Sequence, residues 1–146
     1  MSKKIFPIIR KVLNFSNVNI KNKILKNDYH LIDINNHHKL KKLNNKLLNE
    51  DGHPQISPDK NFIITDTYAD KNGYMKLLLL HRSTEKVYVL GEFKVAEYLI
   101  KNNLKYDLHP RWDNSGSLIN IDSSHVGSRQ NFVLSIEKLL LKLKHS

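Results

Sequence analysis

The chain has 146 residues, a formal net charge of +10 and no cysteine. This length suits one domain with a core of its own, and the absence of cysteine excludes disulfides, thiolate metal sites and a cysteine nucleophile. No stretch approaches the roughly 18 apolar residues of a membrane span, and the apolar run near the N-terminus is too short for a signal peptide. We therefore expect a cytoplasmic chain without a membrane partner.

The positive charge is concentrated in the first third of the chain. Residues 1–50 carry 11 Lys and Arg against 3 Asp and Glu, whereas residues 51–146 carry 13 against 11. The basic third is rich in Lys and Asn, and Lys-rich stretches without interleaved aromatic or arginine residues give only non-specific attraction to phosphates. We expect a solvated basic surface and no nucleic-acid partner.

In chain order, residues 1–27 form a poorly defined basic segment, in which residues 4–13 are the best candidate for a strand. Residues 29–34 and 39–43 precede His53 as residues 75–81 and 86–93 precede His109, so they predict two strands. We interpret residues 28–50 as the end of one structural repeat.

Residues 51–105 predict a full four-stranded repeat. Its apolar, branched segments are short enough for strands and are separated by turn residues. The residues after them have apolar positions at helical spacing, which predicts a short inserted helix. The expected elements are strands at 53–57, 62–67, 75–81 and 86–93 and a helix within 94–105.

The same pattern returns 56 positions later. Residues 109–123 align without gaps with residues 53–67: both begin with His-Pro, and both carry a turn of Pro, Asp, Asn, Ser or Gly followed by an apolar segment. Residues 106–146 therefore predict a last repeat of three strands, followed at 138–143 by a fourth strand or a short helix. Four antiparallel strands and a restart are the layout of a propeller blade, so the predicted fold is all-β, an incomplete β-propeller of antiparallel blades with a short inserted helix.

These segments resemble the WD-like repeats of TolB-like β-propellers, and are similar to the oligogalacturonate lyase-like group of bacterial propellers. The resemblance is carried by Asp-Gly-His-Pro at 51–54, by Ser-Pro-Asp at 57–59 and by Asp-Leu-His-Pro at 107–110. In the lyases, histidines at blade starts are expected to hold a divalent metal such as manganese beside an acidic sugar. The resemblance thus implies His53 and His109 as ligands, while a complete ligand set and catalytic residues are not identified.

Other polar residues are expected near the same end of the blades. His125 follows a second strand and is our third candidate metal ligand, while Asp66, Asp122 and Arg129 are candidates for binding the substrate. Imidazoles and carboxylates together suit zinc, manganese or iron, and an arginine can hold a carboxylate in a fork.

Each of these residues also has a structural interpretation. The His-Pro segments can hydrogen-bond a neighbouring blade, and the two aspartates can cap turns through backbone N–H groups. Arg129 can pair with an acid, Trp112 is expected in the core, and His37 and His38 are expected to be solvated.

Three functions remain open from the sequence. The first is an incomplete propeller, a C-terminal fragment without catalysis of its own. The second is a module that binds carbohydrate or a protein and acts as an oligomer. The third is a metal-dependent lyase or hydrolase of acidic oligosaccharides.

Overall fold

The computed structural model describes residues 28–35, 39–43, 46–104 and 106–144. These residues are mostly β, in antiparallel sheets with two short helices, as the sequence predicts. The chain divides into two compact units, Met1–Glu50 and Asp51–Ser146. Neither described helix is long and apolar enough to cross a membrane. The expectations for residues 1–27, including the strand at 4–13, and for His37 and His38 lie outside the described residues.

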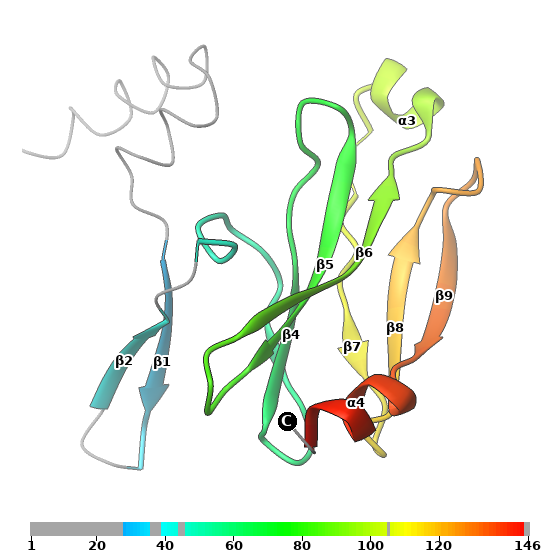
Figure 1. The fold of residues 1–146 in the computed structure, drawn as a ribbon. Helices are drawn as coiled ribbons and strands as arrows, with labels where there is room; N and C mark the ends of the chain where they lie inside the picture. Colours follow the sequence, from blue (N-terminus) through cyan, green and yellow to red (C-terminus); the bar gives the residue numbers. More distant parts are fainter. Residues whose placement is uncertain (1–27, 36–38, 44–45, 105, 145–146) are drawn as a thin grey trace, which may run out of the picture. The chain divides into compact units, whose positions relative to one another are not determined.

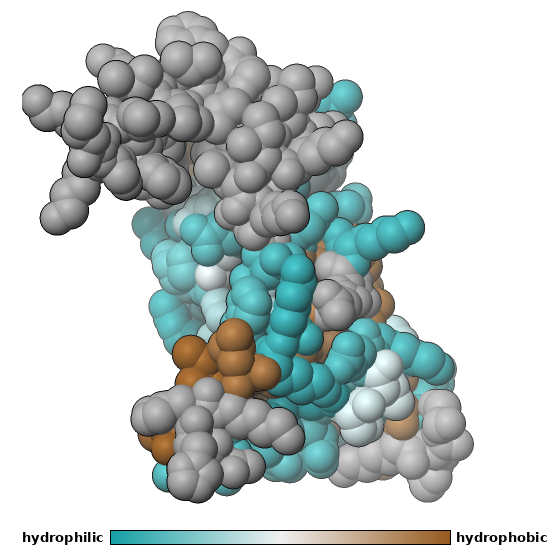
Figure 2. All heavy atoms as spheres, turned by 90° about the vertical axis from the view of Figure 1, so that its left-hand side faces the viewer, coloured by the Kyte–Doolittle hydropathy of each residue, from teal (hydrophilic) through white to brown (hydrophobic). Residues whose placement is uncertain are grey.

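The described part of the first unit contains one hairpin. β1 (Tyr29–Asp33) pairs antiparallel with β2 (Lys39–Leu43), which confirms the two strands predicted here. Leu43 and Leu48 are buried. Figure 2 shows a group of apolar atoms beside hydrophilic ones. In the described part of this unit, the exposed large apolar residues are Ile32, Ile34, Leu40 and Leu47.

The first sheet of the second unit has four strands in sequential order. They are β3 (Gln55–Ile56), β4 (Phe62–Asp66), β5 (Tyr74–His81) and β6 (Val87–Lys94). Each pairs antiparallel with the next, which confirms the four strands predicted for the full repeat. Every residue of β4 is buried, so this strand is covered on both faces.

The second sheet repeats this order with three strands, β7 (Arg111–Trp112), β8 (Leu118–Ser123) and β9 (Gln130–Ser135). Helix α3 (Glu97–Lys101) connects the sheets, as the helical spacing predicts. The residues after β9 form helix α4 (Glu137–Lys144), which decides between the strand and the helix left open by the sequence. Figure 1 shows the two sheets side by side, with α3 at one end and α4 at the other.

The core lies between the two sheets. Ile119 and Ile121 alternate with half-exposed residues along β8 and are fully buried, because a strand turns successive side chains to opposite faces. They belong to one apolar cluster with Ile64, Met75 and Leu77 of the first sheet. One face of each sheet therefore packs on the other sheet.

Equivalent turns join the first two strands of each sheet. In the first turn, the Ser57 hydroxyl accepts a hydrogen bond from Phe62 N (2.9 Å); in the second, the Asp113 carboxylate accepts one from Leu118 N (2.9 Å). Gly116 in the second turn has a φ of +72°, and an added Cβ would lie 3.3 Å from Pro58 Cδ in the first. Glycine is therefore favoured there by its left-handed backbone and by the close approach of the turns, although Lys60 adopts a similar φ of +61° at the equivalent position of the first turn.

The Asp113 turn is expected to weaken in acid. The Ser115 hydroxyl, and then backbone N–H groups, lower the pKa of Asp113 from 3.8 to about 2. A lowered folded-state pKa stabilises the fold at pH values above 3.8, and this contribution is lost as the pH falls toward about 2. Asp113→Asn cannot titrate, so the stability difference between wild type and variant should shrink over this range. Urea unfolding measured at several pH values tests this, and a constant difference would contradict it.

Candidate metal centre

The two His-Pro segments lie next to each other. His53 precedes β3 and His109 precedes β7, and these two strands are linked through Gln55. The side-chain oxygen of Gln55 accepts a hydrogen bond from Trp112 N (2.7 Å), and the backbone carbonyl of Gln55 accepts one from Trp112 Nε1 (3.1 Å). Because the repeats are equivalent and adjacent, the residue that begins each of them is brought to the same place.

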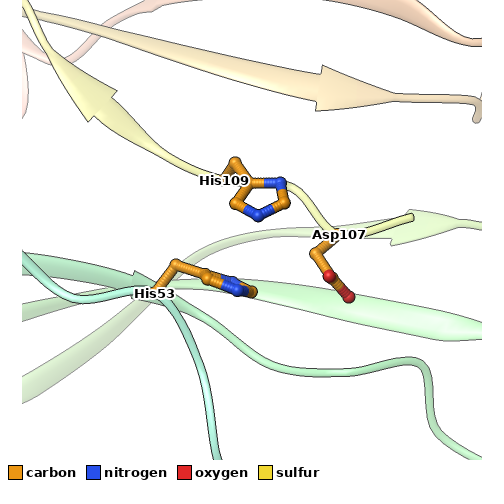
Figure 3. Close-up of side chains that lie close together, drawn as sticks. All are labelled: His53, Asp107 and His109. Carbon is orange, nitrogen blue, oxygen red and sulfur yellow. The ribbon is translucent and has the colours of Figure 1, made fainter. Parts of the chain in front are cut away.

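The imidazoles form a small cluster with a carboxylate. The ring centroids of His53 and His109 are 4.1 Å apart, and Asp107 lies beside them, as Figure 3 shows. One ligand atom from each of the three side chains lies within 4.8 Å of the other two, and all three residues are partly exposed. It is the one group of three or more metal-ligating side chains found in the described part of the chain.

Asp66, at the end of β4, anchors both histidines through a carboxylate that is only 1% exposed. Its Oδ1 accepts a hydrogen bond from His53 N (2.8 Å) and lies 3.0 Å from His53 Nδ1. Its Oδ2 accepts one from His109 N (3.0 Å). This last bond holds His109 in a left-handed conformation, with a φ of +43°, which only a few per cent of non-glycine residues adopt.

The surroundings of the cluster favour positive charge. The ring of Tyr68 meets His53 edge-on, with 6.2 Å between centroids. Burial, and then the carboxylates of Asp51, Asp107 and Asp66, raise the pKa of the Tyr68 phenol above its ordinary value. The carboxylates act by opposing the phenolate charge, so the same negative potential attracts a cation.

The donor set fits a transition-metal cation. Imidazole nitrogen and carboxylate oxygen are ligands of zinc, manganese and iron. With metal–ligand bonds of about 2.0–2.1 Å, ligand atoms around tetrahedral zinc lie roughly 3.3 Å apart. The ligand atoms of the three side chains lie within 4.8 Å of one another, so binding of an ion would draw them closer together. Three protein ligands leave a coordination position open for water or a substrate.

The other candidate residues lie in different surroundings. His125 is exposed, and its Nδ1 lies 2.8 Å from Ser123 Oγ. Its ring packs against the rings of Phe93 and Phe132, and it is not part of the three-residue cluster. Arg129 is paired with Asp122 at 3.4 Å, as its structural interpretation predicts.

Trp112 follows its structural interpretation, whereas Asp66 does not cap its own turn as predicted. Asp66 accepts backbone N–H groups, although those belong to the two His-Pro segments and not to its own turn. Trp112 is partly buried and packs against the core cluster.

Asp107 was not among the predicted ligands, although the sequence contains a signal for it. An aspartate stands two residues before each His-Pro, at positions 51 and 107. This Asp-x-His-Pro repeat places a carboxylate near each imidazole. Of the two aspartates, only Asp107 belongs to the cluster.

An open cavity of about 800 Å³ adjoins the cluster. It lies among residues 68–73, α3 and the segment that leads to β7, and Tyr68 and Asp107 line it. Tyr106 also lines it, with the Arg129 guanidinium carbon 5.9 Å from the centre of its ring. The cavity gives a small molecule access to Asp107.

Comparison of the chain with protein-family models, curated proteins and solved structures finds no match.

Proposed function

We propose that the second unit is a cation-binding module whose His53, Asp107 and His109 hold one divalent transition-metal ion. The observation that carries the proposal is the approach of three ligand atoms to within 4.8 Å, contributed by two equivalent Asp-x-His-Pro segments. The negative potential felt by Tyr68 and the partial exposure of all three ligands support it further. Zinc and manganese are among the ions that this mixture of imidazole and carboxylate suits.

Titration of the metal-free chain with zinc and with manganese tests the proposal. Isothermal titration calorimetry should give one site per chain for at least one of the two ions. Absence of binding by both ions would contradict the proposed function.

We further propose that the two sheets are neighbouring blades of the TolB-like β-propeller type. The 56-residue repeat, the sequential antiparallel strand order of both sheets and the packing of one sheet face on the other support this interpretation. The proposed metal ligands then lie at the starts of two adjacent blades.

The outer face of the β7–β9 sheet differs from the equivalent face of the first sheet. Where the first sheet has Ile64 and Leu77, the second has Asn120 and Asn131. Asn131 Nδ2 donates a hydrogen bond to Asn120 Oδ1 (2.8 Å), so these amides pair with each other. A polar outer face is typical of a repeat that ends a stack, and we infer an open pair of blades on this side.

Restoring the apolar residues should make this face associate. Asn120→Ile combined with Asn131→Leu would extend the apolar surface of Val133, which is 63% exposed, and of Leu118, which is 37% exposed. Light scattering after size-exclusion chromatography should show a larger mass for the double variant than for the wild type. An unchanged mass at high protein concentration would contradict the interpretation of this face as a polar end.

A second candidate function is the binding of a carboxylate-bearing oligosaccharide, which the resemblance to oligogalacturonate lyases suggests. The cavity beside Asp107 favours it, because a sugar placed there would reach the proposed cation. Binding of galacturonate oligomers only when manganese or zinc is present would support this function. Equal binding with and without the ion would contradict a role of the cation in it.

A further inference from the structure

Asp66 has more interactions with the two histidines than a turn cap requires. Its carboxylate, 1% exposed, binds the main chain of both His53 and His109. In addition, both of its oxygens lie close to His53 Nδ1, at 3.0 and 3.2 Å. Asp66 therefore holds the side chain of one proposed metal ligand, His53, and the main chain of two, His53 and His109.

This contact determines which nitrogen of His53 can bind a cation. An ionised carboxylate only accepts hydrogen bonds, so the proton of a neutral imidazole must lie on Nδ1 when Nδ1 faces Asp66. The lone pair is then on Nε2. A carboxylate behind the imidazole in this way also orients the ring and makes the free nitrogen a better metal ligand.

We propose that Asp66 is the positioning residue of the cation site: it holds His53 as the Nδ1–H tautomer, with Nε2 as the ligand atom, and sets the backbone of His109. The inference rests on the proposed cation-binding function. Asp66 itself does not touch the ion, because its carboxylate oxygens are occupied by His53 and His109.

The repeat supplies a matched comparison in Asp122, which occupies the position equivalent to Asp66. Its side chain is 20% exposed and bonds Arg129 and Asn131 instead of a histidine. The same residue type at the same place in the repeat therefore binds histidines in the first repeat and an arginine and an asparagine in the second. Asp122→Asn removes an equivalent charge without changing the surroundings of His53.

The test is the tautomer of His53, measured on the full chain by two-bond 1H–15N correlation NMR. In mildly alkaline, metal-free buffer, the wild type and Asp122→Asn should both show the Nδ1–H form. Asp66→Asn should shift His53 toward the Nε2–H form, because the amide N–H can donate to Nδ1. An Nε2–H tautomer in the wild type would overturn the proposal, and this result does not depend on whether Asp66→Asn folds.

Zinc titration of the same three proteins completes the test. Asp66→Asn should bind zinc about 10–100-fold more weakly, as expected for loss of a carboxylate behind a ligating histidine, whereas Asp122→Asn should match the wild type. Equal affinity in folded Asp66→Asn and wild type would overturn the positioning role. If the wild type shows the Nδ1–H tautomer but binds no zinc or manganese, the proposed cation-binding function is wrong. The role of Asp66 in positioning His53 for a cation is then wrong as well.

Discussion

Replacing His109 by alanine is expected to weaken cation binding by at least about 100-fold, because loss of a ligand should exceed the 10–100-fold effect of losing a residue behind one. The substitution removes one of three ligands and leaves the His53 and Asp107 side chains in place. Isothermal titration calorimetry with zinc and manganese measures the change. Far-UV circular dichroism of the variant establishes that the strands are retained.

The matched control is His125→Ala. His125 is an exposed histidine of the same unit that lies against Phe93 and Phe132 and outside the three-residue cluster. Its removal should leave the stoichiometry and the affinity unchanged. If His125→Ala abolished binding and His109→Ala did not, the cation would lie elsewhere and the proposed site would be wrong.

Truncating Ile121 to alanine should destabilise the second unit by about 2–5 kcal/mol, because it creates a cavity in a packed core. Ile121 is fully buried in the apolar cluster between the two sheets, together with Ile64 and Leu77. Urea unfolding followed by circular dichroism gives the free energy of unfolding for the wild type and the variant.

Val133→Ala is the control for this prediction. Val133 lies on the neighbouring strand β9, but its side chain is 63% exposed, so its truncation should change stability by no more than about 0.5 kcal/mol. Similar losses for both variants would show that the interface between the sheets is not the main core of the unit.

The strands of the second unit were predictable because their determinants are local. Short apolar segments separated by Ser-Pro-Asp or Asp-Asn-Ser-Gly turns specify a β-meander, and the second copy supports the interpretation of the first. The end of the chain was less certain, since residues 138–143 are apolar enough for a strand or a helix. Their helical form in α4 leaves the second sheet with three strands.

The candidate site was only partly predictable because it depends on the path of irregular segments. The shared His-Pro starts identified His53 and His109, but the identity of the third ligand depends on how residues 107–109 turn. The left-handed φ of His109 could not be predicted from the sequence, because only a few per cent of non-glycine residues adopt it. The sequence therefore offered His125, whereas the cluster contains Asp107.

The different surroundings of Asp66 and Asp122 were also hidden in the sequence. Both stand at the same repeat position, but Asp66 is buried between two sheets and Asp122 is partly exposed on an outer face. Which of the two aspartates is buried depends on how the repeats are arranged in space. For the same reason, the sequence alone does not show that Asn120 and Asn131 pair with each other on the outer face of the second sheet.

Anomalous diffraction at the zinc absorption edge, from crystals of the chain grown with zinc, tests the central claim most directly. The account predicts one strong anomalous peak within bonding distance of His53, Asp107 and His109. A peak at His125 alone, or no peak between the two Asp-x-His-Pro segments, would contradict it.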